Sequence, residues 1–198
     1  MNKLYNFLTY SVHNFTKIFM GLEIVNEQRL ANAENCIIVA NHISILDPPF
    51  IGSIIPLEIH YLAKSEIFKN KLMDKFFRSI NAIPVKRGRI DKYAITTVQE
   101  LLSSGRSLLI FPEGTRNGGK AKAGVGKFAI QMKVDILPIY IENSNKFLKC
   151  LFRKKHLRII VGEKYKYEEY SHLEEKKENY RELANIVYKK ILDLKNES

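Results

Sequence analysis

Short apolar runs alternate with amphipathic segments along most of the chain. The run CIIVA at 36–40 is continuously apolar, as expected of a strand that is buried on both faces of a sheet. Similar runs predict strands at 23–25, 59–63, 82–85, 107–111, 136–141 and 158–161. Apolar residues at helical spacing predict helices at 49–55, 71–80, 91–103, 124–133 and 175–194. We therefore expect a single α/β domain with a mostly parallel central sheet flanked by helices on both faces.

Two prolines add detail to this prediction. Pro138 lies inside a predicted strand and cannot donate to a sheet ladder, so we expect a sheet edge or a bulge there. Pro48 suits the first position of a helix, and the residue before a proline is disfavoured in the helical region. Asp47 is therefore expected to be the N-cap of the helix that follows.

Residues 1–22 predict an N-terminal amphipathic helix. Its rings and basic flanks are typical of a helix in a membrane interface, although a helix that only covers its own domain would show the same pattern. We favour the membrane-interface helix. A transmembrane helix is not expected, because spanning a bilayer takes roughly 20 apolar residues and Lys17 interrupts this stretch.

The chain is strongly basic. Lys and Arg number 32 against 21 Asp and Glu, a formal net charge of +11. This charge favours an anionic partner, which could be nucleic acid, an acidic membrane surface or a phosphorylated substrate. The two cysteines, Cys36 and Cys150, form no disulfide framework and no metal-ligand spacing.

Polar residues follow several of the predicted strands at the point where each strand ends. Asn41 and His42 follow the first buried strand, Arg87 follows the strand at 82–85, and Glu113 follows the strand at 107–111. Because ligands gather at the carboxyl ends of parallel strands, we expect these side chains to converge. Asp47 is close enough in sequence to orient His42, the arrangement of a general base and its carboxylate partner. A loop histidine beside a simple helix cap would have the same spacing.

Other kinds of chemistry have weaker support. Gly114 to Lys120 has the spacing of a phosphate-binding P-loop, but Ala121 stands where a Mg²⁺-binding hydroxyl is needed. Ser44 lacks the context of a serine nucleophile, and Cys36 lies in an apolar strand. The histidines are scattered, so we expect no metal site. Basic clusters around Arg87 and Arg116 suit a phosphate group, and no nucleic-acid-binding motif accompanies them.

Several blocks together resemble the glycerolipid acyltransferase family, of the 1-acyl-sn-glycerol-3-phosphate acyltransferase type. Asn41-His42-x-Ser44-x-x-Asp47 is similar to the family's NHxSxxD block. Phe111-Pro112-Glu113-Gly114-Thr115-Arg116 is similar to its FPEGTR block, and Leu137-Pro138-Ile139 resembles the block with a proline in an apolar strand. Arg87 fits the second block, although Asn81 stands where the family usually has Gly, and Asn117 replaces the Ser that usually ends the third block.

The resemblance implies an enzyme that transfers a fatty acyl group from an acyl thioester to the sn-2 hydroxyl of 1-acylglycerol 3-phosphate. The thioester is carried by acyl carrier protein or coenzyme A, and no further cofactor is implied. His42 would be the base and Asp47 its partner. The substrate-binding residues implied are Asn41, Ser44, Arg87, Glu113, Gly114, Thr115 and Arg116. Backbone amides around Asn41–Ser44 or at Gly114 would stabilise the oxyanion.

The same resemblance sets expectations for organisation and location. Residues 1–22 would be the membrane-interface helix and residues 23–198 the acyltransferase domain. We expect a peripheral or monotopic protein on the cytoplasmic face of the cell membrane, with an apolar groove beside the first helix for acyl chains. Its partners would be the lysophospholipid, the acyl thioester, the anionic membrane surface and acyl carrier protein, without nucleic acid. A different lysolipid or glycerol 3-phosphate as acceptor, and a non-catalytic membrane- or nucleic-acid-binding protein, are the alternatives.

Overall fold

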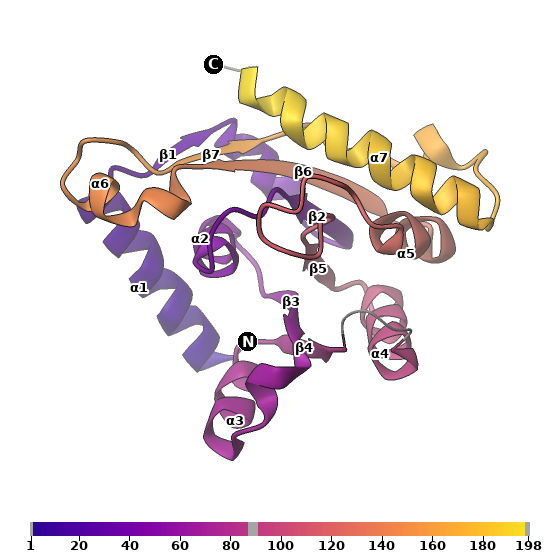
Figure 1. Cartoon of the computed structure of the whole chain (residues 1–198), viewed down its shortest axis with the longest axis horizontal. Coiled ribbons are helices and arrows are strands. Elements are labelled where there is room, and N and C mark those ends of the chain that lie inside the picture. The colour runs from indigo at the N-terminus through magenta and orange to yellow at the C-terminus, as the bar shows by residue number, and fades with distance from the viewer. Residues whose placement is uncertain (1, 87–90, 197–198) are drawn as a thin grey trace.

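The computed structural model describes residues 2–86 and 91–196 (Figure 1). Within these ranges, seven strands form one sheet in the order β1-β7-β6-β2-β5-β3-β4. All pairs of neighbouring strands are parallel except β6 and β7. The strands are β1 Glu23–Val25, β2 Cys36–Ala40, β3 Ile59–Lys64, β4 Ala82–Val85, β5 Ser107–Ile110, β6 Asp135–Glu142 and β7 Arg158–Val161. The predicted single α/β domain with a mostly parallel sheet is confirmed.

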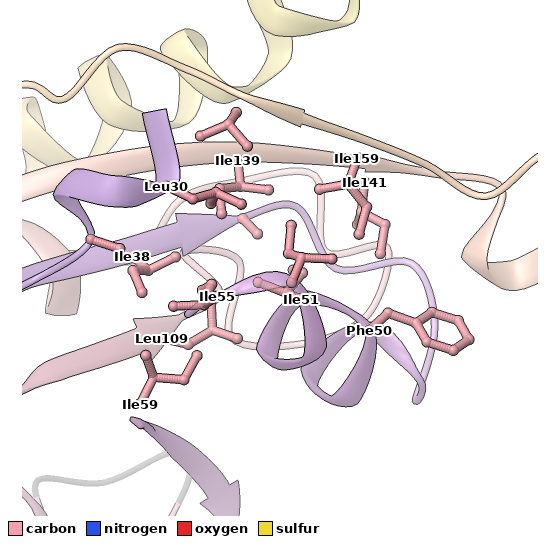
Figure 2. Packing of buried hydrophobic residues seen from close by; sticks show 14 of the residues in the cluster. Leu30, Ile38, Phe50, Ile51, Ile55, Ile59, Leu109, Ile139, Ile141 and Ile159 are labelled. Atoms are coloured by element: carbon pink, nitrogen blue, oxygen red, sulfur yellow. The ribbon is translucent and has the colours of Figure 1, made fainter. Parts of the chain in front are cut away.

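Helices cover both faces of the sheet, and β2 shows why. All five residues of β2 are buried, and successive side chains point to opposite faces. Ile38 joins a core under α1 and α2, whereas Ile37 and Val39 join a second core under α4, α5 and α7. Figure 2 shows Ile38 in the first core, with Ile51 of α2 and Leu109 of β5. The helices are α1 Lys3–Phe19, α2 Asp47–Ile54, α3 Lys71–Ser79, α4 Lys92–Ser103, α5 Gly124–Met132, α6 Phe147–Leu151 and α7 Lys177–Asp193.

Pro138 lies in an inner strand, between β2 and β7, so the expected sheet edge is wrong and the expected bulge is confirmed. The ladder pairs Ile139 with Val161, and the next bridge pairs Ile136 with Tyr165. Two residues of β6 therefore face three on the opposite side. The proline falls in this irregularity, where its carbonyl accepts the amide of Gly162 at 2.8 Å.

Asn81, which departs from the family pattern, precedes β4 with a φ of 64°. This is the left-handed conformation that glycine adopts without strain and that asparagine tolerates better than most other residues. The substitution therefore keeps the backbone turn that a glycine would give. Asn117, the other departure, also has a positive φ, of 54°.

The N-terminal helix packs against its own domain along one side. Tyr5 and Thr16 are buried, and α1 contacts α2. Its outward side carries large exposed apolar residues: Leu4, Phe7, Tyr10, Phe15, Ile18 and Phe19. Across the described ranges no helix combines the length and the apolar character that crossing a bilayer requires.

Candidate active site

The loop after β2 brings a histidine and an aspartate into direct contact. His42 Nδ1 lies 2.8 Å from Asp47 Oδ2, and the aspartate is completely buried. The same oxygen accepts the backbone amides of Ile43 at 2.7 Å and Ser44 at 2.8 Å. Because three donors converge on one oxygen, the loop between the two residues is fixed, and with it the imidazole.

Asp47 is not the N-cap that its position before Pro48 predicts. The helix begins at Asp47 itself, with Leu46 as the N-cap residue, and the Asp47 carboxylate turns back over the preceding loop. It accepts the amides of Ile43 and Ser44, whereas Pro48 and Pro49, which follow it in the helix, have no amide hydrogen to donate. In this orientation the carboxylate binds the loop that carries His42 instead of capping the helix.

A residue far along the chain completes the environment of this carboxylate. Ser144, the first residue of the 3₁₀ turn Ser144–Lys146 that follows β6, donates its hydroxyl to Asp47 Oδ1 at 2.5 Å. Both side chains are buried. Sequence reasoning missed Ser144, since its loop carries no local motif for this role.

Glu113 supports the histidine from a second direction. Its Oε2 accepts the backbone amide of His42 at 2.9 Å, and its Oε1 accepts the hydroxyl of Tyr188, on α7, at 3.0 Å. Burial raises the pKa of Glu113, while the hydrogen bonds from Tyr188 and His42 act in the opposite direction. Burial and the neighbouring Glu113 likewise raise the pKa of Tyr188 to about 12. Tyr188 is a second residue that sequence reasoning missed.

Asn41 and Ser44, two of the expected substrate-binding residues, are engaged within the protein. The Asn41 side chain is buried and exchanges two hydrogen bonds with the backbone of Ile141, at 2.9 and 2.8 Å. The Ser44 hydroxyl accepts the amide of Leu46 at 3.2 Å. Among the described residues, Asn41, Ser44 and Glu113 do not line the cleft described next. Their positions hold β2, β6 and the histidine loop together.

A cleft of about 1150 Å³ opens beside His42. Its walls are mainly apolar and come from α1, α3, α4, α5 and the carboxyl ends of β3, β4 and β5. Tyr5, Leu8 and Val12 of α1 form one wall, as expected of a groove beside the first helix. The ring of Phe111 stacks on the imidazole of His42, with ring centroids 4.2 Å apart.

Among the described residues, the charged groups that line the cleft, which we call its mouth, are five cations and one acid: Lys64, Lys86, Arg116, Lys122, Lys127 and Asp91. Gly114 and Thr115 line the cleft as well. Gly114 has a φ of 66°, and a side chain there would come within 2.9 Å of the Lys122 amine, so the position favours glycine. Three expected binding residues thus meet His42 at one cleft. Arg87 and its neighbour Arg89 lie outside the described residues.

The amides expected to stabilise an oxyanion are mostly engaged. Those of Ile43 and Ser44 bind Asp47, that of His42 binds Glu113, and that of Gly114 binds the Phe111 carbonyl at 2.9 Å. Burial raises the pKa of the Cys36 thiol to about 11, which makes it a poor nucleophile. A base that activates an external nucleophile is the chemistry that this site offers.

The family model described as Acyltransferase matches residues 21–142, which include β2, His42, Asp47 and the Glu113 loop. The chain belongs to this family. A 1-acyl-sn-glycerol-3-phosphate acyltransferase of Bacillus subtilis is 29% identical over 196 residues, covering 98% of this chain and 98% of that protein. One of Streptococcus pneumoniae is 32% identical over 117 residues, 58% of this chain and 44% of that protein.

A solved structure has the same fold. The crystal structure of the 1-acyl-sn-glycerophosphate acyltransferase PlsC from Thermotoga maritima matches 98% of this chain and 82% of its own, with a TM-score of 0.69 and 21% identity. The acyltransferase fold expected from the sequence is therefore confirmed, including the helix that precedes β1.

Proposed function

We propose that this acyltransferase moves a fatty acyl group from a thioester to the sn-2 hydroxyl of 1-acylglycerol 3-phosphate, which gives phosphatidic acid. The observation that carries the proposal is the His42–Asp47 hydrogen bond at the edge of an apolar cleft with a cationic mouth. Relatives that match 98% and 58% of this chain bear the name of this activity.

His42 acts as the general base in this proposal. With Nδ1–H donated to Asp47, Nε2 is free to take the proton of the acceptor hydroxyl. The oxygen attacks the thioester carbonyl carbon, and the tetrahedral intermediate then expels the thiolate. The imidazolium gives the proton to the sulfur, so the products are the new ester and a free thiol. General-base catalysis of this kind contributes about 10²–10⁴-fold.

The cleft suits both parts of the acceptor. Its apolar walls fit an acyl chain, and Arg116 with Lys122 at the mouth suits the phosphate. Glu113 and Asn41 act as positioning residues because their side chains bond to the histidine loop and to β6. The acyl donor is a thioester of acyl carrier protein or of coenzyme A.

The enzyme works at an anionic membrane surface in this proposal, on the cytoplasmic face. A surface helix normally has one apolar side, but α1 is apolar inward and outward. Phe7 and Tyr10 are 66% and 71% exposed, and such rings are typical of helices that lie in a membrane interface. The net charge of +11 favours the same surface.

One relative favours a different acceptor. A lyso-ornithine lipid O-acyltransferase of Pseudomonas aeruginosa is 37% identical over 84 residues, 42% of this chain. That acceptor lacks the phosphate that the cations at the mouth would bind. A panel of acceptors therefore separates the two activities.

The test follows thiol release by purified protein with an acyl thioester and lysophosphatidic acid, lyso-ornithine lipid or glycerol 3-phosphate. We expect release that requires lysophosphatidic acid and is lost in His42→Ala with the fold intact by circular dichroism. Parallel reactions with acyl carrier protein and coenzyme A thioesters identify the donor. Release that persists in His42→Ala would contradict the role of the base, and release only with another acceptor would contradict the proposed substrate.

A further inference from the structure

The loop between β6 and β7 has an unusual composition. No acidic residue occurs from Asn143 to Gly162, and this stretch contains six Lys or Arg residues. Five of them, which we call the cationic segment, lie exposed within residues 146–155: Lys146, Lys149, Arg153, Lys154 and Lys155. In the described ranges, none of the five forms a salt bridge.

Large apolar side chains alternate with these cations. Helix α6, at the centre of the segment, buries Cys150 and packs Phe147 against the core. Leu148 is 65% exposed and Phe152 71% exposed. Leu148 in this five-residue helix and Phe152 just after it are exposed among cations that form no salt bridge in the described residues, the composition of a membrane-surface element.

The cationic segment is joined to the C-terminal end of α1. The ring of Phe147 stacks on Phe15, with centroids 6.3 Å apart and planes 9° from parallel. The Arg153 guanidinium donates to the carbonyl of Ile18, in the last turn of α1, at 2.6 Å. A cation at a helix C-terminus also complements the helix dipole. Figure 1 shows α6 beside this end of α1 and away from α7.

We infer that the cationic segment is a second lipid-binding element, which docks with α1 on an anionic bilayer. The inference deepens the proposed function, since it names the part of the surface that holds the enzyme on its lipid substrate. The unpaired cations complement acidic headgroups, and Leu148 and Phe152 reach the apolar layer below them. Two points of attachment, at α6 and along α1, fix the orientation of the protein on the membrane.

The exposed apolar groups distinguish this partner from an acidic carrier protein. Cations alone would suit either one. The neighbours of Leu148 and Phe152 in sequence contact α1, since Phe147 stacks on Phe15 and Arg153 binds the Ile18 carbonyl. Phe15 and Ile18 are exposed too, so exposed apolar groups of the segment and of α1 gather where the two elements meet. An apolar surface edged with cations fits a bilayer.

The first test is sedimentation with vesicles of phosphatidylglycerol and phosphatidylcholine. The apolar variant carries Leu148→Ser with Phe152→Ser, and the charge variant carries Lys149→Gln, Lys154→Gln and Lys155→Gln. Controls on α7 and on the 3₁₀ turn that follows it are Leu192→Ser and the triple variant Lys177→Gln, Lys189→Gln, Lys195→Gln, all at exposed positions. Each cation near an anionic surface contributes about 1 kcal/mol, so the loss of three should weaken binding to anionic vesicles on the order of 100-fold. The controls should bind within about threefold of the unmodified protein.

A fluorescence measurement tests insertion directly. The chain contains no tryptophan, so Phe152→Trp gives a single reporter. Its emission should shift to shorter wavelength on anionic vesicles and be quenched by brominated lipid chains. The same reporter at Leu192→Trp should show neither change.

Acyl transfer to detergent-dispersed lysolipid separates this inference from the proposed function. Both segment variants should keep the unmodified rate there and lose rate on vesicles. Vesicle binding equal to that of the unmodified protein would overturn the inference. So would loss of rate on the dispersed substrate, or a rate loss confined to acyl carrier protein thioesters with vesicle binding intact.

Discussion

The hydroxyl of Ser144 donates to Asp47 Oδ1 across 97 positions of sequence, and both groups are buried. The other carboxylate oxygen holds the histidine and its loop. Ser144 thus fixes the plane of the carboxylate that orients His42. A hydrogen bond to a charged group contributes about 1.5–3 kcal/mol.

Ser144→Ala should therefore lower kcat about tenfold or more, with little change in KM. The Asp47 carboxylate would keep its charge but lose the hydrogen bond that Ser144 donates to Oδ1. Ser53→Ala is the matched control, because within the described part of the chain the Ser53 hydroxyl bonds only to the carbonyl of Phe50 in its own helix. An unchanged kcat in Ser144→Ala would show that the plane of the carboxylate is held without it.

Asp47→Asn should separate the charge of the carboxylate from its geometry. One amide oxygen can replace Oδ2 and still accept from His42, Ile43 and Ser44, while the Ser144 hydroxyl turns to accept from the new NH₂. We expect a folded protein with kcat lower by about 10²-fold or more, because the imidazolium loses its counter-charge. Asp47→Ala should lose stability as well. Thermal unfolding and kcat measured on both variants check this, and an Asp47→Asn enzyme of normal kcat would contradict it.

Tyr188→Phe should move the acidic limb of the kcat–pH profile to higher pH. Burial raises the pKa of Glu113, and the Tyr188 hydrogen bond opposes that rise, so its removal raises the pKa further. More of the carboxyl is then protonated at mildly acidic pH, and the His42 amide loses its charged acceptor. Activity at alkaline pH should stay near normal.

Tyr180→Phe, on the same helix, should leave the pH profile in place. A purely structural role for Tyr188 predicts a different result, with kcat lowered by the same factor at every pH. That outcome would exclude the link through Glu113.

Gly126→Ala should destabilise the contact between α5 and α7. A Cβ at Gly126 would lie 2.1 Å from the backbone oxygen of Tyr180, so the two helices would have to move apart. We expect the free energy of unfolding to fall by about 1–3 kcal/mol. Gly124→Ala, where nothing lies within 4 Å, should stay within about 1 kcal/mol of the unmodified protein. Urea denaturation of both variants measures the difference, and equal stabilities would contradict the close approach.

The order of elements and the convergence of the site follow from the sequence, because apolar runs and strand ends are local signals. Glu113 contacts His42, as the strand ends predict, and His42 contacts Asp47, as their spacing predicts. Gly114, Thr115 and Arg116 line the same cleft as His42, as the family resemblance implies. The direction of the Asp47 carboxylate does not follow, since its spacing suits a cap and a loop anchor equally. Helix α6 is too short, at five residues, to show a helical period.

The supporting residues need three-dimensional information. Ser144 and Tyr188 act on residues 97 and 75 positions away, through contacts that depend on how β6 and α7 lie against β2. No sequence motif marks either of them. In retrospect, the sequence contains one indication of Tyr188: its hydroxyl-bearing side chain borders the inward apolar positions Leu183, Val187 and Ile191.

Helix α1 is the wall of the cleft on one side and an apolar surface on the other. The cleft is thus separated from the outer apolar surface by the width of one helix, about 10–12 Å. In the membrane-bound arrangement that we propose, a fatty tail that moves from the leaflet into the cleft travels around a single helix, a distance shorter than its own length. The headgroup can remain at the water boundary throughout, so substrate loading resembles lateral diffusion within the leaflet more than extraction from it.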